Sequence, residues 1–152
     1  MNDSSSIEQE LKNGRQVLVN TRGISMRPLL WEGKTQVIVR PPDRPMQIGD
    51  LPLVRVRTGL YRLHRTVRME NGTIYTRGDN CMAAEAVSPE NVLGFVTEIY
   101  RGNKKIPMDG IGYHMYTWLW LHSFPVRLVI YRIRALVLRL VRGVVHRVKK
   151  WF

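Results

Sequence analysis

The sequence predicts a mainly β domain that carries a short N-terminal helix and a C-terminal amphipathic helical tail. Short runs rich in β-branched residues recur between turn residues, and from Met115 the apolar periodicity becomes helical. Charge divides in a similar way: residues 1–100 hold 13 Lys/Arg against 11 Asp/Glu, and residues 101–152 hold 11 against one. We therefore expect a β domain over residues 1–107 and a basic helical tail over residues 108–152.

The first predicted element is a short helix over Ile7–Lys12. Ser5 with Glu8 three residues later fits a capping box, and Asn13-Gly14 fits a helix end. Alternating apolar residues bounded by turn residues then predict a series of short strands. These strands cover Gln16–Asn20, Thr35–Val39, Leu51–Val56, Tyr61–Val67, Thr73–Thr76 and Val92–Tyr100. Short strands at this spacing are typical of a mainly β domain.

The predicted tail carries an apolar stripe at helical spacing from Val129 to Val144, with five arginines off the stripe, and Pro125 is expected to separate two helices. The stripe either packs on the β domain or lies on, or inserts into, a membrane with anionic headgroups. We favour the membrane surface. Nucleic-acid binding is not expected, because the arginines alternate with large aliphatic residues and no recognition motif is present.

Composition limits the chemistry that this chain can perform. One cysteine, Cys81, permits no internal disulfide, and the histidines at 64, 114, 122 and 146 lack metal-ligand spacing, so we expect neither metal nor cofactor. The polar N-terminus lacks the pattern of a cleavable signal peptide. No uncharged apolar run reaches the roughly 18 residues of a conventional transmembrane helix. With the tail on a membrane surface, the expected location is therefore peripheral to a membrane. The sequence does not identify which side of the membrane the protein occupies.

Three segments carry the residues of a candidate catalytic site. Ser25 lies between a strand and the turn limited by Pro28, where its hydroxyl would be exposed at the end of a β element. His64 lies inside a predicted strand, and Asp79 lies in a Gly-Asp-Asn turn, followed shortly by Glu85. Taken alone, each segment could equally be an ordinary loop, a strand with a structural histidine, or a common turn. Together, serine, histidine and a carboxylate are the chemical types that a catalytic triad needs, because serine requires a base.

Five segments in this order resemble the successive conserved boxes of the type I signal peptidase family. They are Ser25-Met26-x-Pro28, Gly49-Asp50, His64-Arg65-x-Val67, Gly78-Asp79-Asn80 and Val92-Leu93-Gly94-x-Val96. The resemblance extends from about Gly23 to Tyr100. Any one box is weak evidence, whereas five in register are strong. The resemblance implies a signal-peptidase-like catalytic β domain over residues 1–107.

The resemblance also implies an activity, that of a serine endopeptidase cleaving a peptide, protein or leader sequence through an acyl-enzyme. Ser25 would be the nucleophile. His64 would be the general base and then the acid that protonates the leaving amine. The chain has no lysine between Lys34 and Lys104, so His64 occupies the box of the usual dyad lysine, as in the endoplasmic-reticulum type.

The third catalytic member stays open between two carboxylates. Asp79 or Glu85 would orient the imidazole, and Asp79 is preferred because its box matches better. A main-chain amide near Ser25 would supply part of the oxyanion hole. By the same resemblance, substrate would bind as an extended strand beside the core, with small side chains near the cut.

Two departures from the family separate this chain from secretory-signal removal in its usual form. We expect no N-terminal transmembrane anchor, and the cationic tail is not required by the family. A self-cleaving repressor of the same fold is disfavoured, because those proteins use a Ser–Lys pair behind a DNA-binding domain. The remaining alternative is a non-catalytic, membrane-associated regulatory or binding protein on a peptidase scaffold.

Overall fold

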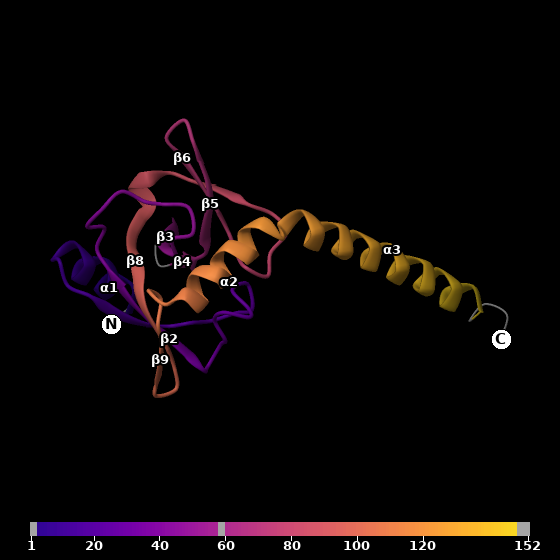
Figure 1. The fold of residues 1–152 in the computed structure, drawn as a ribbon, viewed down its shortest axis with the longest axis horizontal. Helices are drawn as coiled ribbons and strands as arrows, with labels where there is room; N and C mark the ends of the chain where they lie inside the picture. The colour runs from indigo at the N-terminus through magenta and orange to yellow at the C-terminus, as the bar shows by residue number, and fades with distance from the viewer. Residues whose placement is uncertain (1–2, 58–59, 149–152) are drawn as a thin grey trace. The chain divides into compact units, whose positions relative to one another are not determined.

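The computed structural model describes residues 3–57 and 60–148, with side chains described from residue 7 to residue 139 apart from 58 and 59 (Figure 1). It confirms the predicted fold class: a mainly β domain with a short N-terminal helix, α1 (Asp3–Lys12), and two C-terminal helices. Contacts group the chain into two compact units, Met1–Trp118 and Leu119–Phe152.

The larger antiparallel sheet has the strand order β1-β2-β8-β3-β4, and β9 pairs with the C-terminal end of β8. Its strands are β1 (Val17–Asn20), β2 (Thr35–Arg40), β3 (Pro52–Arg57), β4 (Leu60–Leu63), β8 (Val92–Arg101) and β9 (Lys104–Ile106). The ten-residue strand β8 pairs with β2, β3 and β9 and so organises the sheet (Figure 1). A Cβ at Gly94 would collide with the backbone of Arg40, so glycine allows these strands to pack closely.

A second, smaller sheet has the order β5-β6-β7. Its strands are β5 (Arg65–Glu70), β6 (Thr73–Arg77) and β7 (Glu85–Val87), and a short 3-10 turn, η1 (Pro89–Asn91), leads from β7 into β8. The β5–β6 hairpin projects from the body of the domain at the top of Figure 1.

The core lies against the larger sheet and includes the segment that follows Ser25. On β2 the buried side chains alternate with outward ones, as expected for a strand with one covered face. Met26 and Leu30 are 5% and 2% exposed and pack with the sheet's own buried residues. Burial of these two side chains anchors the Ser25 loop to the core.

The prediction of one continuous strand over Tyr61–Val67 is wrong. The structure ends β4 at Leu63 and begins β5 at Arg65, and the two strands belong to different sheets. The amide of Thr66 donates to the carbonyl of Asp50, and the carbonyl of Thr66 accepts from Gly49, each at 2.8 Å. The chain therefore exchanges one strand partner for another at His64.

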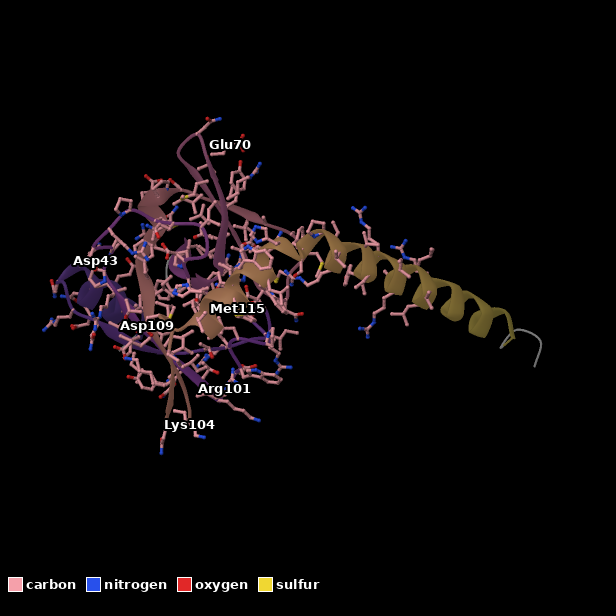
Figure 2. The ribbon with its side chains drawn as sticks, viewed as in Figure 1. Asp43, Glu70, Arg101, Lys104, Asp109 and Met115 are labelled. Atoms are coloured by element: carbon pink, nitrogen blue, oxygen red, sulfur yellow. The ribbon has the colours of Figure 1, made fainter. Side chains whose placement is uncertain are left out.

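Other element boundaries differ from the sequence prediction in smaller ways. Helix α1 begins at Asp3 rather than at Ile7, and the three-residue strands β7 and β9 were not predicted. Helix α2 (Ile111–His122) begins after Asp109 and before Met115, which had marked the expected start of helical periodicity (Figure 2).

The C-terminal helices are interrupted where a break was expected. Helix α3 (Phe124–Val148) begins next to Pro125, and a single residue, Ser123, separates it from the end of α2. The strands end at Ile106, beside the predicted division at residue 107, whereas the compact units divide after Trp118. In the described part of the chain, no helix has the length and apolar character to cross a membrane.

Candidate active site

Ser25 lies in the loop between β1 and β2, and backbone bonds hold this loop in place. The carbonyl of Ser25 accepts a hydrogen bond of 2.7 Å from the amide of Asn80, and the Asn80 side chain donates to the carbonyl of Ile24 at 3.3 Å. Gly23 has a φ of +81°, a conformation that favours glycine. The loop is thus tied to the Gly-Asp-Asn turn on one side and to the core on the other.

His64 lies at the junction between β4 and β5 and is 6% exposed. Burial is the main cause that lowers the pKa of its imidazole below the ordinary histidine value, and the nearby charges of Glu85 and Asp79 oppose that shift. Within the described residues, Nδ1 of His64 has no hydrogen-bond partner. The imidazole is therefore held in its neutral, basic form near pH 7.

The Ser25 segment and His64 come close to each other at Gly78. A Cβ built on Gly78 would lie 2.6 Å from the Ser25 carbonyl oxygen, 2.8 Å from Sγ of Cys81 and 3.1 Å from Nε2 of His64. These three atoms surround one point, where no side chain fits. The glycine of the Gly-Asp-Asn turn is therefore required by close approach, as in other places where backbone meets a site.

Ser25 and His64 line the same cavity, which has a volume of about 700 Å³. Cys81 and Glu85 also face it, and burial raises the pKa of the Cys81 thiol. One part of its wall is apolar and comes from α1, β1, the Ser25 loop, β3 and β4: Ile7, Val19, Met26, Leu30, Leu53, Leu60 and Leu63. Beside Ser25 and His64 there is thus a cleft with an apolar wall, of the size that binds extended chains or small ligands.

Asp79 is outside the lining of this cavity, and its carboxylate forms a buried ion pair with Arg65. Its two carboxylate oxygens accept from Nε and Nη2 of Arg65, each at 2.8 Å, and the pair is 2% and 1% exposed. Burial lowers the pKa of Arg65, but the hydrogen bond to Asp79 and its charge outweigh that effect and raise it. The structure does not bring Asp79 to Nδ1 of His64, so its predicted role as the group that orients the imidazole stays a prediction.

Glu85, the alternative third member, lies at the start of β7 on the rim of the cavity. It forms an ion pair with Arg62, and its side chain is 44% exposed. After burial, Glu85 is the largest influence on the pKa of His64, which it raises. Glu85 therefore acts on the imidazole by charge through the cavity, and no hydrogen bond joins it to Nδ1 among the described residues.

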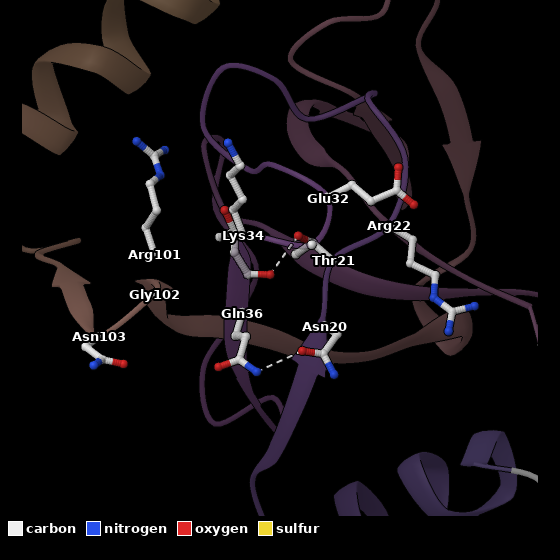
Figure 3. A pocket seen from close by; sticks show the side chains of 11 residues that line it. Asn20, Thr21, Arg22, Glu32, Lys34, Gln36, Arg101, Gly102 and Asn103 are labelled. Carbon is white, nitrogen blue, oxygen red and sulfur yellow. Dashed lines mark hydrogen bonds between the residues drawn. The ribbon is translucent and has the colours of Figure 1, made fainter.

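A second cavity, of about 780 Å³, lies beside the first and is lined by polar residues and glycines (Figure 3). The two share Asn20, Thr21 and Arg22, just before the Ser25 loop. Figure 3 shows two hydrogen bonds across it: Gln36 donates to Asn20, and Thr21 donates to the Thr35 carbonyl, each at 2.8 Å. Its described lining includes neither Ser25 nor His64, so the candidate active site is the first cavity.

Comparison of the chain with family models, curated proteins and solved structures gave no match.

Sequence reasoning predicted Ser25 and His64, which line one cavity, but missed the groups that pack around them. Arg65 directly follows His64, and Gly78 directly precedes Asp79. These neighbouring positions were the only indication in the sequence that the two residues belong to the site. Tyr116 donates a hydrogen bond of 2.9 Å to Asp79, and it comes from a helix that had been assigned to the tail. No sequence pattern links a tyrosine in a helix to a carboxylate 37 residues earlier.

Proposed function

We propose that this chain is a serine endopeptidase of signal-peptidase-like type. The observation that carries the proposal is the convergence at Gly78, where the backbone of Ser25 and Nε2 of His64 face the same point beside an apolar cleft. The order and spacing of the five motifs that resemble type I signal peptidases support the same activity.

The proposed reaction starts with proton transfer. Neutral His64 removes the hydroxyl proton of Ser25 as Oγ attacks the scissile carbonyl carbon, giving a tetrahedral intermediate with a negatively charged oxygen. The intermediate collapses as His64 returns that proton to the leaving amine, which breaks the C–N bond and leaves an ester on Ser25. Water, deprotonated by His64, then attacks the ester and releases the carboxylic acid and the serine hydroxyl.

The arrangement of the larger sheet supports an extended peptide as substrate. Strands β1 and β4 stand at opposite ends of its strand order, and each pairs with one neighbour among the described residues. Both contribute residues to the Ser25 cavity, among them Val19 from β1 and Leu63 from β4. An edge strand offers backbone N–H and C=O groups that an added strand can pair with. A substrate segment placed between these edges would run directly to Ser25.

The tail supplies the proposed second partner, an anionic membrane surface. Residues 119–152 hold eight Lys/Arg and no Asp/Glu. The described part of the stripe is open to solvent: Val129, Ile130, Ile133, Leu136 and Val137 are 51–60% exposed. Burial of each such side chain contributes roughly 1.5–3 kcal/mol, and each cation near an anionic surface adds about 1 kcal/mol. Stripe residues Leu140, Val141 and Val144 lie outside the described side chains.

A serine-directed covalent probe, such as a phosphonylating fluorophosphonate or an acylating penem, tests the peptidase proposal directly. We expect covalent attachment at Ser25, located by peptide mass mapping, because only a serine with an adjacent base is an effective nucleophile at neutral pH. Denatured protein should not react. Absence of labelling on the folded chain, or labelling equally spread over its serines, would favour the alternative of a non-catalytic binding protein on a peptidase scaffold.

Vesicle binding tests the membrane partner with two variants of equal charge. The full chain should sediment with phosphatidylcholine vesicles that contain phosphatidylglycerol, and added salt should release part of it. Ile133→Asp with Leu136→Asp places two charges on the stripe and should abolish binding. Ala135→Asp with Leu138→Asp adds the same charge on the opposite face of α3 and should reduce binding much less.

Three outcomes would contradict this assignment of the tail. If the wild-type protein does not bind anionic vesicles, an anionic membrane surface is not its partner. If both double variants lose vesicle binding equally, charge alone attracts the chain to the membrane. A wild-type chain that dimerises, and a stripe variant that becomes monomeric without any change in vesicle binding, would identify a second copy as the partner.

A further inference from the structure

Helix α2 contributes directly to the buried ion pair next to the active site. Nη1 of Arg65 donates to Oγ1 of Thr117 at 3.2 Å and to the hydroxyl of Tyr113 at 3.5 Å, and it also donates to the carbonyl of Gly49 at 3.0 Å. From the same helix, the hydroxyl of Tyr116 donates to Oδ2 of Asp79 at 2.9 Å. All of these residues belong to the first compact unit.

The ion pair depends on such additional partners. Arg65 and Asp79 are almost completely excluded from solvent, so their remaining donors and acceptors must be satisfied by protein groups or cost free energy. The ring of Tyr116 also lies 5.6 Å from the Arg65 guanidinium carbon, within the range of a cation–π contact. Burial and the neighbouring Asp79 charge raise the pKa of Tyr116, so its hydroxyl stays protonated and remains a donor.

Asp79 in turn stands between the two residues that fix the geometry of the catalytic pair. Gly78, before it, packs against Nε2 of His64, and Asn80, after it, donates to the Ser25 carbonyl. A shift of the Asp79 carboxylate therefore moves both neighbours of the same short turn. Small displacements matter here, because a misplacement of about 1 Å can cost a hundredfold in rate.

We propose that Tyr116 and Thr117 are positioning residues for catalysis, so that α2 is a working part of the peptidase domain and not the beginning of a separate tail. They act through the Arg65–Asp79 pair, which holds the Gly78–Asn80 turn and thereby sets Ser25 relative to His64. This inference rests on the proposed peptidase function, although the hydrogen bonding that it describes can be measured without any substrate.

Tyr116→Phe is the sharpest test, because it keeps the ring and its packing and removes only the hydroxyl. With internally quenched peptides that carry small residues around the cut, we expect kcat to fall about tenfold, because a hydrogen bond to a charged group is lost. KM should change less than twofold, since the apolar wall of the cleft is intact. Thr117→Val, a substitution of similar shape, should act in the same direction, and Thr117→Ser should restore most of kcat.

The matched control is Tyr100→Phe. Tyr100 also donates its hydroxyl to a carboxylate, that of Glu98, but both lie outside the lining of the Ser25 cavity. Loss of this bond should leave kcat unchanged. If Tyr100→Phe and Tyr116→Phe lower kcat equally, or if kcat follows the melting temperature in both, Tyr116 has only a structural role and the inference is overturned.

Amide hydrogen exchange separates this inference from the peptidase proposal. The Asn80 amide donates to Ser25, so Tyr116→Phe should accelerate its exchange several-fold while the amides of β8 keep their protection. Unchanged exchange at Asn80 overturns the positioning role, whatever the kinetics. If the wild-type protein cleaves no peptide and takes no acylating probe, the peptidase proposal fails, and faster exchange at Asn80 still supports the link from α2 to the turn.

Discussion

Replacement of Ser25 by alanine should reduce peptide cleavage by several orders of magnitude and leave the fold intact. The substitution removes one hydroxyl, the proposed attacking group. The Ser25 loop is held by its backbone bond to Asn80 and by the buried side chains of Met26 and Leu30, and alanine preserves all three. Turnover of quenched peptides, measured beside the melting temperature of the same preparation, tests both parts of the expectation.

Ser88→Ala provides a control for this loss. Ser88 precedes η1, and its side chain makes no capping hydrogen bond, so the variant should cleave at the wild-type rate. A clean, folded Ser25→Ala protein that still cleaves near the wild-type rate would remove the basis of the peptidase proposal.

Replacement of His64 should be nearly as severe, and the pH dependence of the wild-type enzyme should identify the same residue. His64→Ala leaves Ser25 without a base. The imidazole is active only when neutral, so the rate should fall as the pH decreases and His64 becomes protonated. Because burial lowers its pKa, the midpoint of that fall should lie below about 6.5, the value for an exposed histidine.

The other histidines provide the control for this assignment. His114 and His122 lie in α2 and outside the lining of the Ser25 cavity, so replacing either by glutamine should not move the acid limb of the pH profile. A catalytic lysine would instead give a rate that rises only on the alkaline side. An active His64→Ala enzyme, or an acid limb that stays in that variant, would contradict the role of His64.

Much of the fold could be predicted from local pattern. The strands β2, β3 and β8 were located to within a few residues, because apolar alternation and bounding turn residues coincide there. The change of sheet at His64 could not be predicted in the same way. No turn residue interrupts Tyr61–Val67, and a change of strand partner depends on contacts with Asp50 and Gly49 that are distant in sequence.

For the candidate site, the sequence pointed to two residues that share a cavity, but it did not indicate which groups hold them in place. Ser25 and His64 do line one cavity, and the Gly-Asp-Asn turn does touch both segments. The assignment of Asp79 to the imidazole came from the order of residue types in a triad. That order cannot show that a buried arginine next to His64 takes both carboxylate oxygens.

The position of α2 after β9 in the chain also bears on when the proposed peptidase would become active during its own synthesis. Translation proceeds from the N-terminus, and domains fold as units as they emerge. Ser25, His64 and the Gly-Asp-Asn turn are all synthesised before β9, whereas Tyr116 and Thr117 follow it. Until both have left the ribosome, Arg65 and Asp79 lack partners that the finished protein provides. Under the proposed peptidase function and positioning role, the nascent chain is therefore a poor peptidase, and neighbouring nascent proteins would be exposed to its full activity only once α2 has emerged and packed.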